Sequence, residues 1–161
     1  MSGARRIVFL TLDEVLMIHT RQLARHGGAG GLRDLGALSS AIAMPRATFG
    51  GRELHATLDE KAGAYLFHVS QAHAFVDGNK RVALASALVF LWLNERAVRA
   101  TEDEVVDLTL GVASGKVTKA EVAVFFLRQH CPEVSVTPSP SSSPAPRLRA
   151  LRPRRGARPS C

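Results

Sequence analysis

The chain has 161 residues, a length that predicts one domain with room for a substantial hydrophobic core. Its longest apolar stretch, residues 82–93, is too short to span a bilayer, which needs about 18 or more such residues. The acidic residues Asp13 and Glu14 follow closely on the segment that begins with Arg5 and Arg6, which argues against a signal peptide. We therefore expect a cytoplasmic protein that does not engage a membrane.

The net charge of +7 belongs to one end of the chain. Residues 1–133 carry 15 basic and 14 acidic side chains, whereas residues 134–161 carry six arginines and no acid. Seven of the eight prolines also lie from Pro132 onward. This composition cannot bury enough apolar surface to offset chain entropy, so we expect a folded domain over residues 1–131 and a disordered tail over residues 132–161. The tail could bind nucleic acid, contact an acidic partner, or be an extension without a selected role.

Helix caps and apolar spacing predict an all-α domain. A Thr-x-x-Glu capping box precedes apolar residues at helical spacing in four places, which predicts helix starts at Thr11, Thr57, Thr101 and Thr118. Asp34 predicts a further start, for a helix over residues 35–43. Residues 5–10 and 94–100 could be extended, but few convincing strands are present.

Two loops separate the first three predicted helices. Residues 27–31 contain four glycines, yet they lack the Gly-Lys-Ser/Thr ending of a phosphate-binding loop, and no clear strand precedes them. We interpret them as a helix terminator. Residues 45–56 are predicted to form a loop around Gly50 and Gly51.

The nine residues from His73 to Arg81 join two predicted helices. The helix that begins at Thr57 carries an apolar stripe, and His73 continues this stripe, so we expect the imidazole to face inward. Residues 82–93 are apolar on nearly every side, which is typical of a buried central helix.

This junction has the residue types of a polyphosphate site. Gly78 with Asn79 is expected to end the first helix, and Asp77 or Asn79 could cap the second. Asn79, Lys80 and Arg81 then fall at a helix start, where free N–H groups and the positive end of the helix dipole attract phosphate. Gly78 lets the backbone approach a ligand closely, and the Asn79 side chain can hold phosphate oxygens.

The remaining polar side chains of the junction suit phosphoryl transfer. His73 has an ordinary pKa of about 6.5, so its neutral form can act as a base. Asp77 offers a hard oxygen ligand for Mg²⁺. Lys80 supplies a point charge and Arg81 a bidentate fork for the polyphosphate.

Some of these residues could also have a purely structural role. Taken alone, His73 could be a core histidine and Lys80 a solvated residue of the first helical turn. We interpret His19, His55 and His68 as structural.

The sequence HAFVDGNKR at residues 73–81 resembles the signature of the Fic/Doc superfamily. In the larger Fic branch the pattern is His-Pro-Phe-x-Asp/Glu-Gly-Asn-Gly-Arg. Here Lys80 stands at the second glycine, as in the Doc (death-on-curing) toxin branch. Ala74 replaces the common proline, and Val82 replaces a frequent threonine. Neither position is among the residues expected to bind phosphate or metal or to act as the base. The resemblance covers roughly residues 7–128.

The resemblance implies a Fic/Doc-like helical bundle that acts as the toxin of a bacterial toxin–antitoxin pair. Doc transfers the terminal phosphate of ATP to a threonine of elongation factor Tu and arrests translation. The resemblance therefore implies ATP and Mg²⁺ as cofactors, a cognate antitoxin as partner and a translation factor as substrate. It implies His73 as the catalytic base, Asp77 as the metal ligand and residues 78–81 as the nucleotide-binding group.

Two alternatives remain open from the sequence. The chain could instead transfer AMP to a protein, as Fic-branch enzymes mostly do, or it could be an inactive Doc fold that serves as a binding protein. The self-inhibitory Ser/Thr-x-x-x-Glu-Gly/Asn pattern of many Fic proteins does not occur in the sequence. This predicts restraint by a separate antitoxin.

Overall fold

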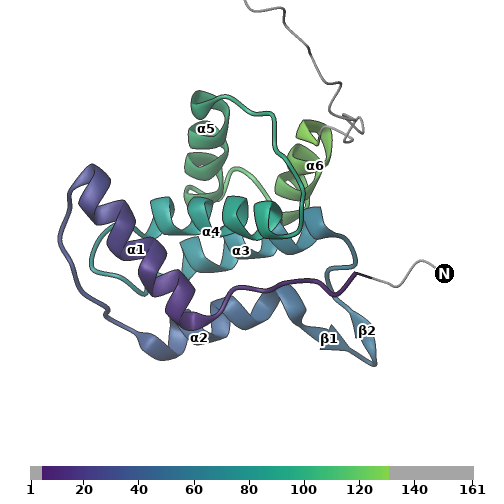
Figure 1. The fold of residues 1–161 in the computed structure, drawn as a ribbon, viewed down its shortest axis with the longest axis horizontal. Coiled ribbons are helices and arrows are strands. Elements are labelled where there is room, and N and C mark those ends of the chain that lie inside the picture. Colours follow the sequence, from purple (N-terminus) through teal and green to yellow (C-terminus); the bar gives the residue numbers. More distant parts are fainter. Residues whose placement is uncertain (1–4, 131–161) are drawn as a thin grey trace, which may run out of the picture.

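The computed structural model describes residues 5–130 as a mostly helical domain (Figure 1). This confirms the prediction of an all-α fold. The helices are α1 (Leu12–His26), α2 (Leu35–Ala43), α3 (Leu58–Ala72), α4 (Asn79–Leu93), α5 (Glu102–Ala113) and α6 (Lys119–Gln129). The predicted disorder and nucleic-acid contacts of residues 132–161 lie outside the described residues.

Local capping determines where most of these helices begin. All four predicted capping boxes are formed, at α1, α3, α5 and α6. At α3, for example, the Glu60 amide donates to the Thr57 hydroxyl at 3.2 Å, while the Thr57 amide donates to the Glu60 carboxylate at 3.0 Å. Asp34 caps α2 as predicted, since its Oδ1 accepts a hydrogen bond from the Ala37 amide at 2.8 Å.

Helix α3 lies at the centre of the fold, in contact with α2, α4, α5 and α6 (Figure 1). Its Tyr65 is fully buried against Phe90 of α4, with ring centroids 5.1 Å apart. The Tyr65 hydroxyl also accepts a hydrogen bond from the Leu10 amide at 3.0 Å, which holds the extended N-terminal segment on the core. Helix α4 buries one long face against α3, but its Trp92 is 75% exposed.

The structure adds elements to the segment that the sequence predicts as a loop. Residues 45–56 contain most of a 3₁₀ helix, η1 (Met44–Arg46), and a hairpin of β1 (Thr48–Phe49) and β2 (Arg52–Glu53). The fully buried Lys61 anchors the end of this hairpin, because its ammonium donates to Glu53 Oε2 at 3.1 Å and to the His55 carbonyl. Within residues 5–130, no helix is long and apolar enough to cross a membrane.

His68 of α3 predicts a loss of stability in acid. Burial, and then repulsion from Lys119 and His55, lower the pKa of His68 from 6.5 to about 4. The unfolded chain takes up this proton near pH 6.5, whereas the folded chain takes it up only near pH 4. The free energy of unfolding should therefore fall as the pH falls through this window. Urea unfolding at several pH values should show that the free energy of unfolding depends less on pH in His68→Gln than in the wild type. An equal pH dependence in the two proteins would contradict this role of His68.

Candidate active site

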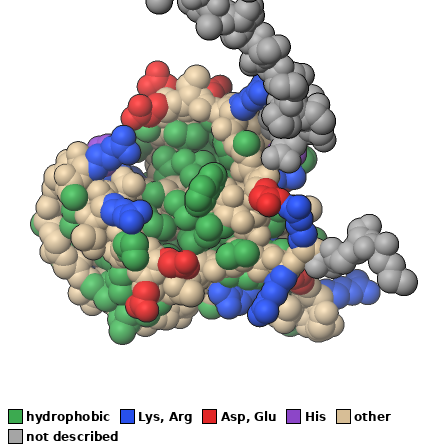
Figure 2. Space-filling view, viewed as in Figure 1, with side chains coloured by type: hydrophobic (Ala, Val, Ile, Leu, Met, Phe, Trp, Pro, Cys, Tyr) green, Lys and Arg blue, Asp and Glu red, His purple; other side chains and the backbone are tan. Residues whose placement is uncertain are grey.

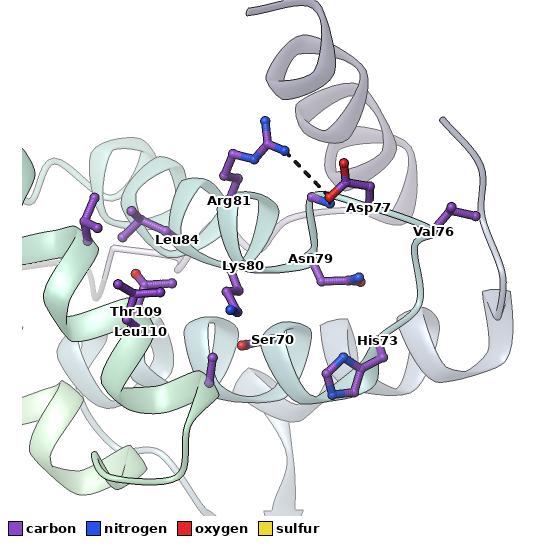
Figure 3. Close-up of a pocket in the computed structure, with 13 residues that line it drawn as sticks. Ser70, His73, Val76, Asp77, Asn79, Lys80, Arg81, Leu84, Thr109 and Leu110 are labelled. Atoms are coloured by element: carbon purple, nitrogen blue, oxygen red, sulfur yellow. Dashed lines mark hydrogen bonds and ion pairs between the residues drawn. The ribbon is translucent and has the colours of Figure 1, made fainter. Parts of the chain in front are cut away.

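A cavity of about 570 Å³ lies where α3 ends and α4 begins (Figure 3). Its volume falls within the usual range for small-molecule sites. The structure brings all six predicted site residues to its wall, namely His73, Asp77, Gly78, Asn79, Lys80 and Arg81. The other lining residues are Ser70, Val76, Leu84, Val106, Thr109, Leu110 and Ala113.

His73 does not continue the buried stripe of α3, so the inward orientation expected from the sequence is wrong. The helix ends at Ala72, and His73 follows as its C-cap in the left-handed conformation, with φ 46° and ψ 36°. This turn carries the side chain off the helix face, so the residue is exposed and lines the cavity. Figure 3 shows the imidazole beside the last turn of α3, with the start of α4 across from it. A non-glycine residue with positive φ is uncommon, and such residues cluster at functional sites.

Four side-chain contacts fix the loop between the two helices. The Asn79 carboxamide accepts from the Phe75 amide and donates to the Phe75 carbonyl, both at 2.9 Å. His19 Nε2 lies 3.0 Å from the Asp77 carbonyl oxygen, and the His19 ring stacks on Phe75 at a centroid distance of 4.0 Å. His19 therefore has a structural role, because it supports the loop between α3 and α4.

Helix α4 begins without a side-chain cap, which corrects the expectation that Asp77 or Asn79 would cap it. The N-cap residue is Gly78, at φ 83°. Asp77 Oδ1 accepts instead from the Gly78 amide at 2.6 Å, and the Asn79 carboxamide is bound to Phe75. The amides of residues 79–81 therefore have no hydrogen-bond partner within the described residues. Such a helix start is suited to binding an anion.

Lys80 and Arg81 point to opposite sides of α4 (Figure 3). Arg81 donates from Nη1 to the Gly27 carbonyl at 3.0 Å, and its Nη2 lies 3.7 Å from Asp77 Oδ1. Lys80 forms no ion pair among residues 5–130 and extends toward α3. In this conformation Lys80, rather than Arg81, is the cation free to meet a ligand in the cavity.

Asp77 fits the way proteins usually hold Mg²⁺. Residues 5–130 contain no group of three or more His, Cys, Asp or Glu side chains that could form a metal cage. Magnesium commonly needs no such cage, because it binds through one or two carboxylates together with water and substrate phosphates. The half-exposed Asp77 carboxylate beside the free amides of α4 offers that kind of ligand.

Gly28 lies against the candidate site residue Asp77, a contact that the sequence did not reveal. The expected helix terminator is present, since Gly27 is the C-cap of α1. The next residue has a φ of +122°, and a Cβ atom added to it would lie 2.4 Å from Asp77 Oδ2. Gly28 therefore lets the loop approach the carboxylate more closely than any side chain would allow.

Replacing Gly28 with alanine should displace the Asp77 carboxylate and so weaken the Mg²⁺ binding that we expect of Asp77. We expect the Mg²⁺ concentration needed for half-maximal nucleotide binding to rise about tenfold or more. Gly50→Ala is a matched control, because Gly50 also has a positive φ, of 58°, but a Cβ atom there would meet nothing within 4 Å. An unchanged Mg²⁺ requirement in a folded Gly28→Ala variant would contradict the assignment.

The apolar wall of the cavity comes mainly from α5. Val106, Leu110 and Ala113 lie there with Leu84 of α4. Thr109 also lines the cavity, but its hydroxyl donates to the Val105 carbonyl at 2.7 Å. No sequence pattern assigns these residues to the cavity, because only tertiary packing brings α5 against the start of α4.

Comparisons with known proteins agree with this geometry. Residues 9–91 match the model of the Fic/DOC family, and the chain belongs to this family. The chain is similar to the protein kinase doc of Escherichia phage P1, with 35% identity over 111 residues that cover 69% of this chain and 86% of the relative. It is also similar to the toxin Doc of Mycolicibacterium smegmatis, with 46% identity over 68 residues that cover 42% of this chain and 52% of that relative. These relatives place the chain in the Doc branch, as Lys80 indicated.

Proposed function

We propose that the protein is a Doc-type toxin that transfers the terminal phosphate of ATP to a protein hydroxyl. The observation that carries this proposal is the uncapped start of α4, whose three free amides share one cavity with His73. The names of its two relatives, one a protein kinase and one a toxin, support the same function.

Different residues of the cavity bind the polyphosphate and take the proton during phosphate transfer. The free amides of α4 and the Lys80 ammonium hold and neutralise the polyphosphate. His73 takes the proton of the acceptor hydroxyl as its oxygen forms a bond to the terminal phosphorus, while the bond from that phosphorus to ADP breaks. Asp77 would hold Mg²⁺, which would supply neutralisation of the phosphate charge.

The proposed partners are a protein substrate and an antitoxin. A translation factor such as elongation factor Tu is the substrate that the Doc resemblance suggests, and its modification would arrest translation. An antitoxin has an apolar surface available beside the cavity, since Figure 2 shows hydrophobic side chains gathered across the middle of the face where α4 lies. Val106 and Leu110 of α5 line the cavity and are about half exposed. An amphipathic helix could cover this surface.

Labelled ATP tests the reaction. The full-length protein is incubated with Mg²⁺, elongation factor Tu and ATP labelled at either the γ- or the α-phosphate. A kinase leaves label from the γ-position on the acceptor protein. Label from the α-position alone would replace the proposal with AMP transfer, and label from neither would support an inactive Doc fold that acts by binding.

A further inference from the structure

Ser70 carries a buried hydroxyl that has no role in the proposed phosphate transfer. It lies on α3, one helical turn before His73, and its side chain lines the same cavity. The residue is only 2% exposed, and its Oγ has no hydrogen-bond partner within the described residues. Buried polar groups in folded proteins nearly always have a partner, so this hydroxyl needs an explanation.

The other lining groups that could serve as its partner are mostly engaged. The Thr109 hydroxyl is bound to the Val105 carbonyl, and the Asn79 carboxamide is bound to Phe75. His73 and Lys80 are the exceptions, because neither side chain has a hydrogen-bond or ion-pair partner among the described residues. Figure 3 shows Lys80 extending from α4 toward the turn of α3 that carries Ser70.

We propose that Ser70 is a positioning residue for Lys80. The ammonium has three donors on a flexible four-carbon stem, so it needs an acceptor to fix its direction. The Ser70 hydroxyl can accept one of these hydrogen bonds, which leaves the other two donors for the polyphosphate. This inference rests on the proposed function, because it assigns Ser70 a role in placing the cation that binds the nucleotide.

A double-mutant cycle on nucleotide affinity tests this role. Binding of the non-transferable β,γ-imido analogue of ATP, with Mg²⁺, is measured by calorimetry for the full-length wild type, Ser70→Ala, Lys80→Ala and the double variant. A lost hydrogen bond to a charged group should weaken binding about tenfold in Ser70→Ala. The double variant should bind no more weakly than Lys80→Ala, because Ser70 acts through the lysine.

Ser86→Ala is the matched control. Ser86 is also fully buried with an unpartnered Oγ, but it lies further along α4 and does not line this cavity. Its replacement should leave affinity unchanged. Wild-type affinity in Ser70→Ala, or losses that multiply in the double variant, would overturn the role of Ser70 alone. A wild type that binds no nucleotide would overturn the proposed function, and this inference with it.

Discussion

Replacing His73 with alanine should slow phosphate transfer by ~10²–10⁴-fold, the usual contribution of a general base. The imidazole lines the cavity beside the free amides of α4, and no other histidine does so among the described residues. Since alanine cannot take the proton of the acceptor hydroxyl, bound ATP should persist without turnover. The measurement is the rate of transfer of γ-label to the acceptor protein, together with growth arrest when the variant is expressed.

Two controls separate lost chemistry from a lost fold or a lost partner. His26→Ala removes an exposed histidine that does not line the cavity, and it should transfer phosphate at the wild-type rate. Deletion of residues 134–161 should leave growth arrest intact if the enzyme causes it. Growth arrest that survives His73→Ala but disappears with residues 134–161 would instead favour a binding protein that acts through its basic end.

Replacing Asp59 with alanine should lower the free energy of unfolding by about 3 kcal/mol. The Asp59 side chain is 5% exposed and accepts two hydrogen bonds from Arg96, one of them from Nε at 3.1 Å. Removing the carboxylate leaves the guanidinium of Arg96, whose side chain is 21% exposed, without its counter-charge. Urea unfolding of the two proteins measures the difference.

Asp103→Ala serves as the control for this change. Asp103 is an exposed acid in the first turn of α5, and its loss should cost well under about 1 kcal/mol. If Asp59→Ala were no more destabilising than Asp103→Ala, the buried pair would not contribute to the stability of the fold. The pair joins the start of α3 to the segment after α4, so its loss should affect the whole bundle.

The helices, and the residues that gather around the first cavity, could be predicted because their signals are local. A Thr-x-x-Glu pattern holds both halves of a capping box within four residues, so the starts of α1, α3, α5 and α6 follow from sequence. The six predicted site residues lie within nine positions of one another, and a single turn of the chain brings them to one cavity.

The structural features that could not be predicted from the sequence depend on contacts between segments far apart in the chain. The direction of His73 follows from a left-handed turn that helical periodicity cannot reveal. Gly28 touches Asp77 only because α1 ends against the start of α4, and Arg81 is turned toward the Gly27 carbonyl by the same approach. The small hairpin depends on the buried Lys61, a residue type that sequence patterns assign to the surface.

Titration of the ¹⁵N-labelled protein with the β,γ-imido analogue of ATP and Mg²⁺ tests the central claim most directly. The amide resonances of Asn79, Lys80 and Arg81 should show the largest shifts, because their N–H groups have no hydrogen-bond partner among residues 5–130 and should bind the polyphosphate. A second cavity, of about 540 Å³, provides the contrast, since it is lined by residues such as His55, Lys119 and Leu127 away from His73. Shifts concentrated around that second cavity, with the start of α4 unmoved, would contradict the account.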